Sequence, residues 1–210
     1  MLQITLPRTA PAPALRGRIG SGFSPDPRRY HLHLAADCPR SLRVTTTLRL
    51  LGLADRVGTT VLGDPASRAA LRAAYEAAGH HYDGTLTVPA LCDTWSGRVV
   101  SNHTPDILDD LAVGLAGRPD LAPPVPAALA EAVRTLLDDA APLAGWSAAL
   151  ALLERRLAGS PYALGDRPTV TDVDLWVALR HHHPASAGAG QSVRSYLGRL
   201  RAHPAFRSGE

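Results

Sequence analysis

The sequence predicts a small α/β domain followed by an all-helical domain. Strand and helix patterns alternate through the first half of the 210-residue chain, and strand patterns disappear after a proline-rich stretch. With 45% hydrophobic residues, a chain of this length can bury a substantial core. We therefore expect an N-terminal arm at 1–27, the α/β domain at 28–116, a linker at 117–126 and the helical domain at 127–210.

Residues 30–34 carry the clearest strand pattern, because apolar and histidine side chains alternate there. Pro39 suits the first position of the helix that follows, where its missing N–H needs no partner, and Gly52 ends that helix. The other elements expected in this half are a strand at 56–62, a helix at 65–79, a hairpin made by 85–93 and 98–101, and a helix at 104–117.

Four helices are expected in the second half, at about 127–139, 143–158, 170–181 and 191–202. Thr169 and Asp172 stand three residues apart at the start of the third. This spacing is typical of a capping box, in which each side chain accepts a hydrogen bond from the other's backbone N–H. We interpret the pair as a folding element.

Composition excludes several functional classes. All 22 basic side chains are arginines, they are scattered, and aromatic residues make up only 5%, so no basic stripe for nucleic acid is expected. No apolar run is long enough to cross a membrane, and the first residues do not resemble a secretory signal. With only two cysteines, we expect a cytoplasmic protein with reduced thiols.

Cys38 is the first candidate site residue. It lies where the first strand ends and the first helix begins, so unpaired N–H groups and the helix dipole favour its thiolate. Arg40 adds a positive charge two residues later. The alternative is a small apolar residue packed at a turn. Cys92, within the expected strand at 85–93, is interpreted as a buried, inert thiol.

Two further segments carry candidate binding residues. Val88-Pro89 is a candidate cis bond, and a cis bond here would turn the Val88 backbone toward anything bound beside Cys38. Thr104 is expected to cap a helix whose N–H groups can hold a carboxylate. Simple capping is the alternative.

These pieces, in this order, resemble the glutathione transferases, and more closely the Xi class, the glutathionyl-hydroquinone reductases. The strand and turn "RYHLHLAADCPRSLR" is similar to the family's "RYHLYVS" running into "CPWAHR". "AYEAAGHHYDGTLTVPALCD" followed by "VVSNHT" is similar to "LYxxxxPxYxGRxTVPVLWD" followed by "IVxNES", and "YALGDRPTVTDVDLW" to "YLxGDxLTEADIRLF". The resemblance covers roughly 23–111 and 148–180, and it implies a thioredoxin-like domain followed by a helical one.

The resemblance also implies a mechanism. Cys38 matches the family's catalytic cysteine, which attacks the sulfur of a glutathionyl adduct, releases the reduced aromatic product and forms a mixed disulfide that a second thiol resolves. Val88 would bind the backbone of glutathione beside Pro89. His103 and Thr104 stand where a Glu-Ser pair holds the γ-glutamyl end, and Pro39 and Arg40 flank the cysteine.

The sequence departs from the family in three respects. Arg40 replaces a tryptophan of the family, so an aromatic side chain is missing from the wall of the expected ligand pocket. His103 replaces the glutamate, and a neutral imidazole cannot pair with an ammonium as a carboxylate does, so glutathione or another low-molecular-weight thiol is the expected cosubstrate. The chain is shorter, and the family's tyrosines around the quinone have no counterparts in 180–190.

Clustered histidines are the remaining feature. His181, His182 and His183 cannot all face one side of a helix, and His80 and His81 lack ligand spacing, so no metal is expected.

Three hypotheses follow. The first is a cysteine-dependent thiol transferase or reductase acting on a small electrophile or thiol adduct, as a homodimer by resemblance. The second keeps the fold but isomerises, adds to or cyclises a specialised metabolite. The third is a non-catalytic binding protein that uses the same cleft.

Overall fold

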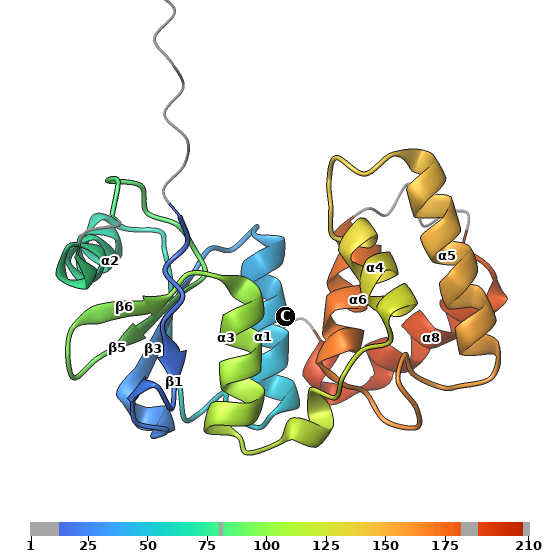
Figure 1. Ribbon diagram of the computed structural model, residues 1–210, viewed down its shortest axis with the longest axis horizontal. Helices are drawn as coiled ribbons and strands as arrows, with labels where there is room; N and C mark the ends of the chain where they lie inside the picture. Colours follow the sequence, from blue (N-terminus) through green and yellow to red (C-terminus); the bar gives the residue numbers. More distant parts are fainter. Residues whose placement is uncertain (1–12, 80–81, 182–188, 208–210) are drawn as a thin grey trace, which may run out of the picture.

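The computed structural model describes residues 13–79, 82–181 and 189–207. It has an α/β half and a helical half that lie side by side, with helix α1 at the boundary between them (Figure 1). This is the predicted fold class.

A four-stranded mixed sheet forms the centre of the α/β half. Its strands are β3 (Tyr30–Leu34), β4 (Gly58–Val61), β5 (Ala90–Asp93) and β6 (Arg98–Ser101). Their spatial order is β4-β3-β5-β6; β3 and β4 are parallel, and the other two pairs are antiparallel. The strand expected at 56–62 is shorter than predicted. The one expected at 85–93 is wrong for 85–89, because only the residues after Pro89 join the sheet.

Helices cover both faces of this sheet (Figure 1). One face packs against α1 (Pro39–Leu50) and α3 (Thr104–Asp109), which a π-helix, η2 (Asp110–Leu115), continues. The other face packs against α2 (Pro65–Ala78). The alternation in β3 is confirmed, since Tyr30, Leu32 and Leu34 are buried in the core on the α1 side.

The helical half contains α4 (Ala127–Leu136), α5 (Leu143–Ala158), α6 (Val170–His181) and α8 (Gln191–Ala202). All four predicted helices are present, and their ends agree with the predicted ends to within one helical turn. Two short 3-10 helices are η3 (Pro119–Leu121), in the expected linker, and η4 (Pro204–Phe206). Helix α1 packs against α6 and η4, which joins the two halves.

Asp172 explains how α6 begins. Its buried carboxylate accepts hydrogen bonds from the backbone N–H and the hydroxyl of Thr169, both at 2.8 Å, and from the Tyr196 hydroxyl at 2.8 Å. The capping box is therefore half correct, because Thr169 donates to Asp172 instead of accepting from its N–H. The role as a folding element agrees with this burial.

The arm expected at 1–27 is more ordered than predicted over its described residues. It contains two short strands, β1 (Arg18–Ile19) and β2 (Gly22–Phe23), and a 3-10 helix, η1 (Pro27–Arg29). Just before β1, the backbone hydrogen-bonds to the strand β6 region, through Gly17 N to Val100 O at 2.9 Å and Asn102 N to Leu15 O at 3.1 Å.

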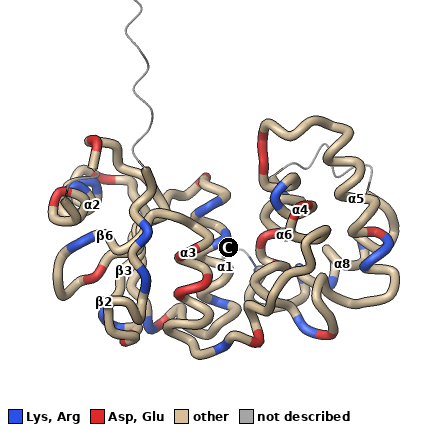
Figure 2. The backbone as a smooth tube through the Cα atoms, viewed as in Figure 1, with Lys and Arg blue, Asp and Glu red and all other residues tan. Residues whose placement is uncertain are grey.

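Ion pairs fix the same segment to α3 and η2. Arg16 donates two hydrogen bonds to Asp106, at 2.7 and 2.8 Å, and Arg18 donates one to Asp110 at 2.7 Å. Figure 2 shows basic positions of the β1 segment beside acidic positions of α3. The prediction missed this order because its partners lie about 90 residues away in the sequence.

Candidate functional site

Cys38 is the N-cap residue of α1, directly after the turn that follows β3. Its carbonyl accepts the first helical hydrogen bond, from Leu42 N at 2.9 Å, and Pro39 occupies the first helical position, as predicted. The thiol is free and half-buried. The fold thus places the sulfur at a helix N-terminus with access to solvent.

The surroundings of Cys38 favour its anion. Burial opposes ionisation, but hydrogen bonds from the Ser41 hydroxyl and from the N–H groups of Ser41 and Arg40, together with the Arg40 charge, outweigh it, and the pKa of Cys38 is lowered. The Ser41 oxygen accepts a hydrogen bond from Ala35 N at 3.0 Å, which leaves its own proton available to the sulfur. In the thiol form Cys38 makes no capping hydrogen bond, so these donors act on the thiolate.

Cys38 lines two adjoining cavities between the halves of the molecule, of about 390 and 330 Å³, which we name the Cys38 cavities. Pro39 lines both of them, and Arg40 lines the larger. The helical half supplies the opposite wall through α6 and the end of α4. The residues of that wall are Leu136, Leu137, Asp139, Val177, Ala178, Arg180 and His181.

His181 is the member of the 181–183 histidine run that lies within the described residues. It is the last residue of α6, and its Nε2 lies 3.8 Å from Oδ1 of Asp139 in the wall of the larger Cys38 cavity. His182 and His183, like His80 and His81, lie outside the described residues. Within the described ranges, no three or more His, Cys, Asp or Glu side chains gather as a metal site would require.

Cys92 differs from Cys38 in both its burial and its pKa. Its side chain is 5% exposed in the core between the sheet and α2. Burial, with a smaller contribution from Asp93, raises the pKa of the Cys92 thiol to about 12. The interpretation of Cys92 as a buried thiol is confirmed.

Val88 and Pro89 are joined by a cis peptide bond, as the sequence suggested. Pro89 is buried at the start of β5, and Val88 is half-buried. Neither residue lines the Cys38 cavities, which lie on the α1 side facing the helical half.

His103 and Thr104 lie at the start of α3, but their roles differ from the prediction. Thr104 is the first helical residue and is buried, whereas His103 is the N-cap and makes no capping hydrogen bond through its side chain. The hydroxyl expected to cap the helix is therefore displaced by one position. Neither residue lines the Cys38 cavities.

A carboxylate lies directly behind His103. Nδ1 of His103 is 3.1 Å from Oδ1 of Asp106, although the ring orientation leaves this buried Nδ1 without a hydrogen bond among the described residues. Hydrogen bonds from the Arg16 guanidinium lower the pKa of Asp106 to about 2.

Sequence reasoning missed the wall from the helical half and the role of Ser41. Ser41 stands three residues after the N-cap, where a side chain can reach the cap, so its position carried a signal. Val177 and His181 stand four apart on one face of α6. Which face meets Cys38 depends on the packing of the two halves, which spacing does not give.

Comparisons with known proteins agree with this architecture. Residues 126–207 match the family model "Glutathione S-transferase, C-terminal domain". Glutathionyl-hydroquinone reductase PcpF from Sphingobium chlorophenolicum is 28% identical over 112 residues. That stretch covers 44% of this chain and 36% of the relative, so the match spans about a third of the relative's length.

Solved structures share the fold over most of the chain. The Xi glutathione-S-transferase from Phanerochaete chrysosporium has a TM-score of 0.69 at 21% identity, covering 96% of this chain and 88% of that one. A Xi-class transferase from Natrialba magadii gives 0.67 at 21% identity, covering 93% and 77%. The glutathione-bound structure of YqjG from Escherichia coli gives 0.62 at 20% identity, covering 89% and 78%. The chain therefore has the glutathione transferase fold, similar to the Xi-class structures, and its residues 126–207 match the C-terminal domain of that family.

Proposed function

We propose that the protein is a thiol-dependent transferase or reductase in which Cys38 is the nucleophile. One observation carries the proposal: the Cys38 sulfur lies at the N-terminus of α1, has a lowered pKa, and lines cavities between the two halves. A thiolate in such a position is the reactive form of cysteine. The similarity to a glutathionyl-hydroquinone reductase indicates the reaction type.

The reaction would proceed in two displacements at sulfur. The Cys38 thiolate attacks the glutathionyl sulfur of an adduct, an S–S bond forms, and the bond from that sulfur to the aromatic carbon breaks. The departing aromatic takes the electron pair and a proton from solvent, and is thereby reduced. A second glutathione thiolate then attacks the mixed disulfide, which releases oxidised glutathione and restores Cys38.

The cosubstrate would occupy the ends of β5 and β6 beside Cys38. In this proposal Val88 and Pro89 contact its peptide backbone, and His103 and Thr104 hold its γ-glutamyl end. The position of His103 and Thr104 at the positive end of α3 supports anion binding there. The proposed thiol-binding set is Pro39, Arg40, Val88, Pro89, His103 and Thr104.

Mass spectrometry after incubation with oxidised glutathione tests the proposed nucleophile. We expect one glutathionyl group on Cys38, full loss of labelling in Cys38→Ala, and unchanged labelling in the matched variant Cys92→Ala. Attachment at Cys92, or full turnover of a glutathionyl adduct by Cys38→Ala, would refute the proposal.

The choice of thiol is tested at position 103. A carboxylate can pair with the ammonium of glutathione where imidazole only accepts a hydrogen bond, so His103→Glu should tighten glutathione binding about tenfold. His103→Gln, which stays neutral, is the matched control and should give no gain. Equal affinity in all three proteins would show that the ammonium does not meet this position.

A further inference from the structure

The proposed mechanism gives His181 no role, although this residue shares both Cys38 cavities with the thiol. His181 lines each of the two cavities from the helical half, and Cys38 lines each of them from the α/β half. The His181 side chain is 48% exposed, so its imidazole can exchange protons with solvent. The nucleophile and a titratable side chain therefore border the same space.

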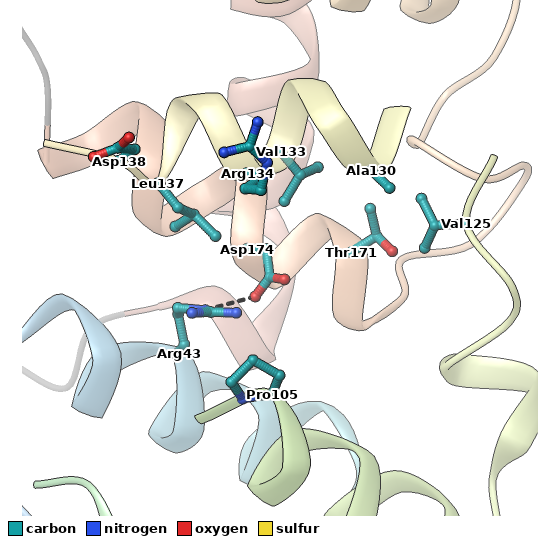
Figure 3. Close-up of a pocket in the computed structure, with 10 residues that line it drawn as sticks. All are labelled: Arg43, Pro105, Val125, Ala130, Val133, Arg134, Leu137, Asp138, Thr171 and Asp174. Atoms are coloured by element: carbon teal, nitrogen blue, oxygen red, sulfur yellow. Dashed lines mark hydrogen bonds and ion pairs between the residues drawn. The ribbon is translucent and has the colours of Figure 1, made fainter. Parts of the chain in front are cut away.

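An ion pair beside the cavities holds the helix of Cys38 against the helix of His181. Arg43 of α1 donates from Nε to Oδ1 of Asp174 of α6 at 2.7 Å, and both side chains are largely buried. Figure 3 shows this pair between the two helices. Because α1 and α6 also pack directly against each other, two joined helices set the spacing between the thiol and the imidazole.

The first displacement of the proposed reaction requires a proton at the leaving group. When the bond from the glutathionyl sulfur to the aromatic carbon breaks, the electron pair stays on that carbon, which must be protonated. Cleavage of a disulfide differs, because its leaving group is a thiolate that is stable without a proton. A proton donor in the site would therefore accelerate C–S cleavage and leave S–S cleavage unaffected.

Among the described residues that line the Cys38 cavities, His181 is the side chain best suited to donate this proton. An imidazole both takes up and releases a proton near neutral pH. Arginine side chains keep their protons, and aspartate side chains have ordinarily lost theirs at neutral pH. Apart from Cys38, the other described lining residues are arginines, aspartates or apolar: Ala36, Asp37, Pro39, Arg40, Leu42, Arg43, Leu136, Leu137, Asp139, Val177, Ala178 and Arg180.

We propose that His181 is the general acid of the C–S cleavage step, an inference that rests on the proposed function of Cys38. The Cys38 thiolate attacks the glutathionyl sulfur, the S–S bond forms, and the C–S bond breaks. The imidazolium of His181 gives its proton to the aromatic carbon, and the neutral imidazole then regains a proton from solvent. Cys38 needs no base, because hydrogen bonds from Ser41 and Arg40 already favour its thiolate.

Two substrates of the same protein test the proposal. Glutathionyl-hydroquinone requires C–S cleavage, whereas oxidised glutathione modifies Cys38 through S–S cleavage alone. In His181→Ala we expect kcat for glutathionyl-hydroquinone to fall about a hundredfold with little change in KM. The rate at which oxidised glutathione modifies Cys38 should stay within about twofold of wild type. Chromatography of released hydroquinone and mass spectrometry of the protein measure the two rates.

Free imidazole separates proton transfer from a structural role of the side chain. Imidazole can enter the partly exposed space left by His181→Ala, and it should raise kcat of this variant at least about tenfold. His203→Asn is the matched control, because His203 lies outside the lining and asparagine can still accept the Ala205 N–H as the N-cap of η4. It should keep the wild-type kcat and should not respond to imidazole.

An unchanged kcat in His181→Ala, an equal loss in both reactions, or a loss that imidazole does not restore would overturn the role of His181. Wild-type protein that reacts with oxidised glutathione at Cys38 but leaves glutathionyl-hydroquinone intact would also overturn it. Circular dichroism confirms that each variant is folded. The proposed function is tested separately by Cys38→Ala, since full turnover by that variant would overturn the function itself, whereas turnover that needs Cys38 but not His181 would overturn only this inference.

Discussion

The two cysteines lie in the same half of the molecule, yet the fold shifts their pKa values in opposite directions. Cys38 ends a turn and meets the N–H groups of α1, whereas Cys92 sits within β5 among apolar side chains and next to Asp93. At Cys38, hydrogen-bond donors lower the pKa by more than desolvation raises it. At Cys92, no donor offsets the desolvation, so the pKa rises. A cysteine's position relative to a helix end therefore decides its chemistry more than its depth alone.

The largest expected effect is on alkylation rate. Because the pKa of Cys92 is raised to about 12 and that of Cys38 is lowered, Cys38 should react with iodoacetamide near neutral pH about a hundredfold faster or more. Peptide mapping of folded protein gives the two rates. Urea-unfolded protein is the control, and the two alkylation rates should converge there. Similar rates in the folded protein would contradict the assigned difference between the two thiols.

The second expected effect is on alkaline stability. The folded protein keeps the Cys92 proton at pH values where the unfolded chain has lost it, so the stability that this thiol contributes is complete below about pH 9 and declines as the pH rises toward 12. At about pH 10 the loss from Cys92 alone is about 1.4 kcal/mol.

Urea unfolding at about pH 7 and pH 10 measures this loss. The difference between the two pH values should be smaller in Cys92→Ala than in wild type by that amount. Cys38→Ala should shift the difference in the opposite direction, because a lowered pKa makes a thiol stabilise the fold as the pH rises. An identical pH dependence in wild type and Cys92→Ala would contradict the assigned environment.

The smallest expected effect is the change in the pKa of Cys38 when the Ser41 hydroxyl is removed. Ser41→Ala removes the hydroxyl that donates to the thiolate, and should raise the pKa of Cys38 by about half a unit to one unit, measured by thiolate absorbance. Thr47→Val is a matched control on the same helix, since the buried Thr47 hydroxyl has no partner among the described residues. A shift of equal size in both variants would show that the Ser41 hydroxyl has no specific role.

Local patterns predicted most of the fold. The helices of the second half and the strand at 30–34 follow from periodicity and helix-stop signals, and the position of Cys38 before Pro39 follows from chain order. The prediction of a strand was wrong for residues 85–89. β-Branched residues there favour a strand, but Pro89 cannot donate a backbone hydrogen bond to the sheet, so the strand begins only after it.

The site was less predictable, because its parts meet through tertiary packing. Arg43 meets Asp174 across 131 positions, and no local pattern pairs them. Thr104 was misplaced by one residue because a threonine before a proline suits either the N-cap or the first turn. The homodimer implied by the resemblance stays a prediction.

The hydrogen bonds that Leu15 and Gly17 make alongside β6 have a consequence for solubility. A strand at the border of a sheet presents unpaired N–H and C=O groups that can recruit the same strand from another molecule. Here the chain's own N-terminal segment occupies part of that border, and Arg16 and Arg18 hold it in place. The protein thereby shields one side of its sheet from intermolecular β pairing.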